Sequence, residues 1–195
     1  ARIRDIRSSE RRMYQKVTDI YSLCSADYSP DSDITKKFFA TVQNKLHFAI
    51  TGKTAPEIIS SRADSAQPYM GLTSWRGTKP RKEDVAIAKN YLKEPELLAL
   101  NNLIEQYLVF AEGQAMRRVP MHMKDWIEKL HGFLTLNDRD ILNDAGKVSH
   151  ELAIQKAEKH FDEYKKSEAK SIDNDFDAVA LQTIEIAKKR VVKKT

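Results

Sequence analysis

The sequence has little of what builds disulfide-rich, membrane-spanning or turn-rich proteins. Cys24 is its single cysteine, so no intramolecular disulfide can form, and we expect a reducing, cytoplasmic compartment. No apolar run approaches the roughly 20 residues needed to cross a bilayer, so we expect no membrane span. Only six glycines and six prolines occur in 195 residues, whereas all-β chains use many in tight turns. These absences favour a protein built from long helices.

The net charge of +5 is concentrated at one end of the sequence. The segment 188–195, KKRVVKKT, carries five cations and no acid, which equals the whole excess. The rest of the chain is formally neutral. A globally basic surface for nucleic acid is therefore not expected, and local patches or the tail are left for that role.

Apolar residues near the start recur at the spacing of an amphipathic helix with a heptad-like seam. They are Ile3, Ile6, Met13, Val17, Ile20 and Cys24. This helix could pair with a second copy to form a homo-oligomer, continue upstream, or pack on its own domain, and the pattern leaves these alternatives open. Because the sequence opens at Ala1 already within the helical pattern, we expect a further segment before it.

The remaining pattern predicts an all-α, single-domain array of helices with no convincing strand. We divide it into an N-terminal helix (1–24), a helical domain (25–181) and a basic tail (182–195). The expected helices in the domain are one that carries apolar residues from Ile34 to Ala49 with Asp33 as N-cap, then 55–64, 82–92, 95–119, 120–138, a short turn at 138–142, and 149–169 before a hinge at 173–176. The segment 65–80 is expected to be a long ordered loop, and such loops are often functional.

The segment 38–64, FFATVQNKLHFAITGKTAPEIISSRAD, predicts two helices joined by a Thr-Gly-Lys-Thr turn. Amides freed at a helix N-terminus, with its partial positive charge, favour phosphate or carboxylate. We therefore predict a ligand or phosphate site that comprises Thr51, Gly52, Lys53, Thr54 and Arg62. His47 beside the turn is the candidate catalytic residue, with an ordinary partly buried histidine as the alternative. For Arg62, a structural ion pair with Asp64 is the preferred alternative to substrate contact.

Two known motifs can be compared with this turn. Gly52-Lys53-Thr54 fits the end of the Walker A sequence GxxxxGK[ST]. The first glycine of that sequence would stand at His47, so a P-loop is not predicted. The turn also resembles the motif His-Pro-Phe-x-Asp-Gly-Asn-Gly-Arg of the Fic and Doc family. There the histidine is the general base and the turn cradles phosphates.

This resemblance covers only part of the motif. His47 stands at the motif's histidine and Gly52 at its first glycine. The departures are Phe48 for proline, Ala49 for phenylalanine, Thr51 for the acid, Lys53 for asparagine, Thr54 for the second glycine and Ala55 for arginine. The resemblance implies an all-α Fic/Doc-like fold and a nucleotide bound with magnesium, while the missing acid and asparagine imply an altered or inert site. Whether the chain is an enzyme stays open.

The loop also contains a candidate nucleic-acid contact. An aromatic residue stands beside several cations, the composition of a surface that stacks bases and contacts phosphates. These residues are Trp75, Arg76, Lys79, Arg81 and Lys82. A solvated loop is the alternative. The histidines after residue 120 lack any tight ligand spacing and only one cysteine exists, so we predict no metal site.

Several segments in order resemble the RhuM family, which is encoded in bacterial genomic islands and prophages. They are RIRDIRSSERRMYQKVTDIY, the segment 38–64 quoted above, YMGLTSW, VAIAKNYL, PMHMKDWIEKLHGFL and GKVSHELA. The resemblance implies a virulence-associated, toxin-like or regulatory protein, with a DNA-binding module before this region.

Two functions follow as expectations. One is an effector that binds a nucleotide at 47–54 and modifies a protein target or nucleic acid. The other is a non-catalytic helical module that oligomerises a DNA-binding regulator. Nucleotide binding, or its absence, separates the two.

Overall fold

The computed structural model describes residues 32–117 and 120–169, together with the isolated positions Gln15, Asp19, Ser25, Asp27 and Ser29. In chain order the elements are α2 (Asp33–Thr51), α3 (Ala55–Arg62), the 3-10 helices η1 (Pro68–Gly71), η2 (Lys82–Ala86) and η3 (Ala88–Tyr91), then α4 (Glu94–Met116) and α5 (Met123–Leu136). Residues 150–169 form a further helix.

The all-α class predicted from the sequence is confirmed. In the described part of the chain, the β-structure is one isolated bridge between Ser25 and Met121. No helix there has both the length and the hydrophobicity needed to cross a bilayer. The predictions made for Cys24, for the hinge at 173–176 and for the tail at 182–195 lie outside the described residues, as does nearly all of the segment 1–24.

Helix α2 forms where the sequence predicts it, with one correction at its start. Its apolar residues Phe38, Val42, Leu46 and Ala49 lie on one face and are buried. The N-cap is Ser32 rather than Asp33, because the Ser32 hydroxyl accepts the amide of residue 35 at 3.2 Å. A serine and an aspartate in succession are equally good caps, so the sequence alone did not separate them.

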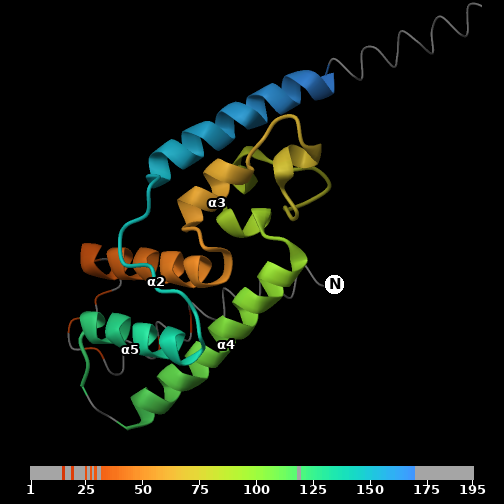
Figure 1. The fold of residues 1–195 in the computed structure, drawn as a ribbon. Helices are drawn as coiled ribbons and strands as arrows, with labels where there is room; N and C mark the ends of the chain where they lie inside the picture. The colour runs from red at the N-terminus through yellow and green to blue at the C-terminus, as the bar shows by residue number, and fades with distance from the viewer. Residues whose placement is uncertain are drawn as a thin grey trace, which may run out of the picture.

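The core lies where α2 packs against both α4 and α5. Figure 1 shows α2 and α5 side by side with α4 crossing them obliquely. Trp126 of α5 is completely buried, and its indole nitrogen donates to the Ser25 hydroxyl at 2.9 Å. Next to it, the rings of Tyr107, Phe110 and Phe133 lie with centroids 5.5 to 6.2 Å apart. Burial of this apolar face holds the three helices together.

The other half of the molecule combines α3, the 3-10 helices and the 150–169 helix (Figure 1). Helix α3 packs on η3, and Ala153 and Ala157 of the last helix are buried. The guanidinium of Arg62 links the two halves. It donates to both carboxylate oxygens of Glu96 at 2.6 Å and to the Tyr91 carbonyl at 2.7 Å. The predicted pairing of Arg62 with Asp64 is therefore wrong.

The prediction of a helix at 82–92 is wrong, because side chains take its carbonyl oxygens. The side-chain amide of Asn90 donates to the Asp84 carbonyl at 2.8 Å, and the Tyr91 hydroxyl donates to the Val85 carbonyl at 3.0 Å. In an α-helix those carbonyls would accept amides four residues later. The segment instead forms the short 3-10 helices η2 and η3.

Two helix ends also differ from expectation. The short helix predicted at 138–142 is absent, because Asp138 has a φ of 53° and the Lys45 ammonium takes the carbonyl of Leu142. Helix α4 ends at Met116, three residues before the predicted end at 119. In contrast, the helix predicted at 149–169 is found at 150–169.

Candidate binding site

The turn between α2 and α3 has the backbone geometry that the sequence predicts. Gly52 ends α2 with a left-handed φ of 67°, which glycine adopts without strain. Thr54 then caps α3: its hydroxyl accepts the Glu57 amide, and the Glu57 carboxylate accepts the Thr54 amide. We call residues 51–57 the joint.

The amides of the joint donate to acceptors within the protein. In chain order the bonds run from Gly52 to the Phe48 carbonyl (2.8 Å), Lys53 to the Thr51 hydroxyl (3.2 Å), Thr54 to the Glu57 carboxylate (2.8 Å), Ala55 to the Asn44 side-chain oxygen (3.2 Å) and Glu57 to the Thr54 hydroxyl (3.4 Å). The amides of Thr54, Ala55 and Glu57 are the donors that an open N-terminus of α3 would offer to an anion. An incoming phosphate would have to displace them.

A carboxylate of the protein already occupies the start of α3. The Glu57 side chain accepts the amide of Lys147 at 2.8 Å as well as that of Thr54. Burial acts to raise the pKa of Glu57, but these amide hydrogen bonds outweigh it and lower the pKa. Gly146 packs so closely on the fully buried Thr54 that a β-carbon at this position would lie 2.7 Å from the Thr54 methyl group. The segment around Gly146 therefore covers one side of the joint.

The other predicted residues of this site point in different directions. His47 is only 3% exposed, and its Nδ1 lies 2.8 Å from the Gln43 carbonyl within α2. The Lys53 ammonium donates to the Ser61 hydroxyl at 3.0 Å along α3. Arg62 is directed at Glu96 of α4. The fold thus brings Thr51 to Thr54 together but turns the three larger side chains to partners of their own.

The joint does not fit the magnesium ion implied by the Fic/Doc resemblance. Magnesium binds through carboxylates and waters, and here Thr51 and Lys53 stand where the resembled motif has an acid and an asparagine. The Glu57 carboxylate is bonded to two amides. In the described part of the chain, no group of His, Cys, Asp or Glu side chains could hold a metal ion.

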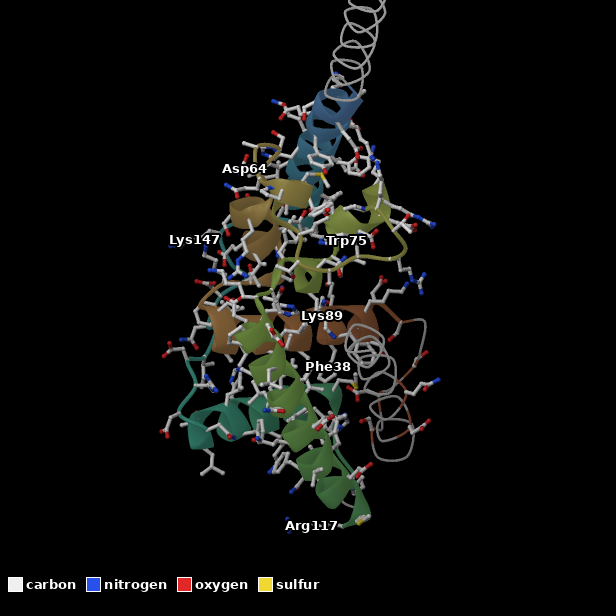
Figure 2. The ribbon with its side chains drawn as sticks, turned by 90° about the vertical axis from the view of Figure 1, so that its right-hand side faces the viewer. Phe38, Asp64, Trp75, Lys89, Arg117 and Lys147 are labelled. Carbon is white, nitrogen blue, oxygen red and sulfur yellow. The ribbon has the colours of Figure 1, made fainter. Side chains whose placement is uncertain are left out.

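A second and more open site lies between the 65–80 loop and the 150–169 helix. It is a groove of about 350 Å³. The loop contributes Pro68, Tyr69, Thr78, Lys79 and Pro80, and the helix contributes Tyr164, Lys165 and Glu168. In Figure 2, Lys147 beside the joint and Trp75 beside this groove lie on opposite sides of the molecule, so the two sites are separate surfaces.

An unusual stretch of backbone places an aromatic ring at the groove. Tyr69 and Met70 have φ of 51° and 59°, followed by Gly71 at 79°. Residues other than glycine rarely adopt this region, and it is held only when the surroundings require it. Met70 is buried, whereas Tyr69 is 44% exposed. Its ring packs on that of Trp75 with centroids 4.5 Å apart.

A buried carboxylate holds the loop in place. Asp84, which is 2% exposed, accepts the amides of Arg76 at 3.2 Å and Arg81 at 3.0 Å. On the other side of Trp75, the amides of Thr73 and Ser74 donate to the Asn90 carbonyl. The loop is therefore ordered, as the sequence predicts, and it presents its aromatic and basic side chains from a fixed backbone.

The charged side chains of the groove form a three-membered cluster. Glu168 accepts from the Lys79 ammonium at 2.6 Å through one carboxylate oxygen and from Lys165 at 2.9 Å through the other. Hydrogen bonds from these two lysines lower the pKa of Glu168, and the bond to Glu168 raises the pKa of Lys79. The cluster carries a net charge of about +1 at neutral pH.

The remaining predicted cations are not among the residues that line the groove. Lys82 pairs with Glu158 of the same long helix at 3.1 Å, and Arg81 pairs with Glu83 at 3.6 Å. The Arg76 side chain is exposed. Of the predicted contact residues, Lys79 lines the groove, and Trp75 packs on Tyr69, which lines it.

Comparison with known protein families identifies the family of this chain. A family model described as the virulence protein RhuM family matches residues 1–172. The chain belongs to the RhuM family. The resemblance drawn from the sequence segments is confirmed, and membership associates the chain with virulence. No curated protein and no solved structure matches the chain.

The joint and the groove of this RhuM family member both lie within the matched residues. Of the residues that line the groove, sequence reasoning identified Lys79 and missed the others, among them Tyr69, Tyr164, Lys165 and Glu168. Pro68 and Gly71, which flank Tyr69 and Met70, carried a weak signal, because proline and glycine close together in a sequence favour a turn. Nothing in the sequence indicated that a helix some 90 residues later would complete the site.

Proposed function

We propose that this RhuM family member is a non-catalytic helical binding module whose groove contacts single-stranded nucleic acid. The observation that carries the proposal is the exposed Tyr69 ring, packed on Trp75 and fixed beside Lys79 and Lys165. Aromatic side chains that stack bases, next to cations that follow the backbone, are how sequence-tolerant single-strand binders work.

At such a site, base stacking and phosphate contacts each contribute a small binding free energy, and the two contributions can be measured separately. Stacking one base on an aromatic ring contributes about 1–3 kcal/mol. Each phosphate neutralised releases a counterion, so that the logarithm of affinity falls by about 0.7 per tenfold rise in salt for single strands. With Lys79 and Lys165 in the groove and one further cation of the loop, such as Lys82, as candidate contacts, we expect a slope of roughly −2.

Fluorescence anisotropy of a labelled oligothymidylate of about 16 nucleotides, at about 50 mM salt, tests this proposal. Tyr69→Asn is the informative variant, because asparagine tolerates a positive φ and keeps the loop backbone while the ring is removed. We expect its affinity to fall about tenfold or more. Lys79→Ala should also weaken binding, whereas Lys36→Ala, an exposed lysine on α2, should not. Absence of binding by the unaltered chain at low salt would refute the proposal.

The competing proposal is a nucleotide site at the joint, with His47 as base and transfer of a nucleotidyl or phosphoryl group. One observation favours it: Gly52 is exposed, and a β-carbon there would meet nothing within 4 Å. Thermal shift with nucleotides, with and without magnesium, tests it, because a ligand stabilises the native state according to its occupancy. A shift that Lys53→Ala abolishes would replace our proposal with this one.

Self-association through the segment 1–24 is compatible with a binding module and stays a proposal. Light scattering of the chain and of a variant with Ile6→Glu and Val17→Glu tests it, because charges on a heptad-like seam oppose pairing. An oligomer of unchanged size in the variant would remove this part of the account.

A further inference from the structure

The acid in the groove is hard to explain if the groove binds a polyanion. Glu168 is the acidic residue among those lining it, and it lies between two of the cations that would contact a phosphate. An acid at this point repels phosphate and neutralises one lysine. Its position nevertheless matches what a bound phosphate would occupy, since both are anions with several oxygens able to accept from two ammonium groups.

We infer that Glu168 is an internal competitor, which occupies the lysine pair of Lys79 and Lys165 in the free protein and gives way to a backbone phosphate of a single strand. This inference rests on the proposed function, and it adds a regulatory residue to the same groove. Glu168 contacts one lysine from the loop and one from its own helix, so it also ties the two walls of the groove together.

The exchange is feasible because both lysines are accessible to solvent, while the Glu168 side chain itself is 26% exposed. The Lys79 side chain is 61% exposed and the Lys165 side chain 40%. Ion pairs at such positions contribute little, because solvent screens them and the long side chains lose freedom. A phosphate that took both lysines would restore the same two charge-assisted bonds, and the released carboxylate would return to water.

The competitor has a consequence for selectivity. A free phosphate, or a sugar-phosphate backbone without bases, must displace Glu168 and makes no stacking contact in return. The resting groove therefore binds such anions poorly. A nucleotide within a strand displaces Glu168 and also stacks its base on Tyr69 beside Trp75. The carboxylate thus makes binding depend on the base, although the base sequence is not read.

The test compares Glu168→Gln and Glu168→Ala with Asp162→Asn in the full chain. Asp162 is an exposed acid on the same helix that does not line the groove, so its substitution makes the same change in net charge. Affinities are measured for oligothymidylate and for an abasic deoxyribose-phosphate oligomer of equal length. We expect both Glu168 variants to bind oligothymidylate roughly 5-fold more tightly than Asp162→Asn does. The gain in affinity for the abasic oligomer should be larger, so that the ratio between the affinities for oligothymidylate and for the abasic oligomer decreases.

The outcomes separate this inference from the proposed function. If the unaltered chain binds oligothymidylate and the Glu168 variants bind no better than Asp162→Asn, the inference fails and the nucleic-acid proposal stands. If neither the chain nor the variants bind at low salt, both fail. A Glu168 variant that gains affinity for an acidic peptide but none for oligothymidylate would show that the groove is built for a protein partner, and would overturn the inference as stated.

Discussion

Two glycines with left-handed backbone differ in what surrounds them. Gly52 has a φ of 67° and open space where a β-carbon would lie, whereas a β-carbon at Gly71, with a φ of 79°, would lie 2.3 Å from the Arg62 carbonyl oxygen. Gly71 is therefore required by its conformation and by a backbone contact that cannot move cheaply. Gly52 is favoured by conformation alone.

We expect Gly52→Ala to cost about 1 kcal/mol of unfolding free energy, which is the usual penalty for an L-residue in this region. Gly71→Ala should cost at least about 3 kcal/mol, because the clash displaces the Arg62 backbone or the 69–71 turn. Urea denaturation of both variants measures the difference. Equal costs would contradict the close approach of Gly71 to α3.

A second residue-scale feature is the ion pair between α3 and α4. Two hydrogen bonds from Arg62 lower the pKa of Glu96 and outweigh the effect of burial, which acts to raise it. Both side chains are less than a quarter exposed. Because the folded pKa is depressed, the stabilisation is fully present above the unfolded pKa of about 4.3, and it is lost as the pH falls through the lower, folded value.

Glu96→Gln should therefore lower the unfolding free energy by about 2 kcal/mol at pH 7. The difference from the unaltered chain should shrink as the pH is lowered below about 4. Chemical denaturation at several pH values checks this, with Glu94→Gln, an exposed acid two residues earlier at the start of the helix, as control. A difference that stays constant with pH would mean that the pair does not carry the stability assigned to it.

At the scale of elements, one carboxylate connects two segments that are distant in sequence. Glu57 caps its own helix through the Thr54 amide and holds the segment before the last helix through the Lys147 amide. This arrangement explains why the joint resembles an anion site in sequence and behaves as a structural junction in the fold. The helix N-terminus does attract a negative charge, and the chain supplies that charge itself.

Glu57→Ala should consequently loosen two places at once. We expect a loss of about 1 kcal/mol from the cap and faster hydrogen exchange at the Lys147 amide, which would lose its acceptor. Exchange measured by NMR at Lys147, with Glu158→Ala as the comparison variant, tests the connection. Unchanged protection at Lys147 would show that Glu57 is only a local cap.

The sequence predicted elements well where the pattern is local and poorly where distant side chains intervene. The apolar spacing of Phe38, Val42 and Leu46 was enough to place α2. Residues 82–92 have a similar helical composition, but Asn90 and Tyr91 side chains divert the carbonyls that a helix needs. The same holds at 138–142, where Lys45 from α2 takes the Leu142 carbonyl. Side chains that compete for backbone carbonyls in this way leave no periodic pattern in the sequence.

The geometry around the two candidate sites could not be read from the sequence for a related reason. The basic and aromatic composition of the 65–80 loop identified Trp75 and Lys79, because stacking and phosphate contact need those residue types. The left-handed turn that exposes Tyr69 depends on burial of Met70 and on the approach of Gly71 to α3. At the joint, the turn was predicted correctly, but its internal hydrogen bonds involve Asn44 and Lys147, which no local motif includes.

At the scale of the whole molecule, the fold separates a packed helical core from a surface made of a loop and the last described helix. The α2, α4 and α5 core supplies rigidity, and the Arg62 to Glu96 pair connects it to the half that carries the groove. The two candidate sites are on different faces (Figure 2). A single bound nucleic acid can therefore report which of them is used.

Photo-crosslinking with a bromouridine-containing oligonucleotide, followed by mass spectrometry of the crosslinked peptides, tests the central claim most directly. The account predicts crosslinks at Tyr69, Trp75 or Tyr164 that disappear when unlabelled oligothymidylate competes. Crosslinks confined to residues 47–57, or to the basic segment 188–195, would contradict the assignment of the groove as the binding site.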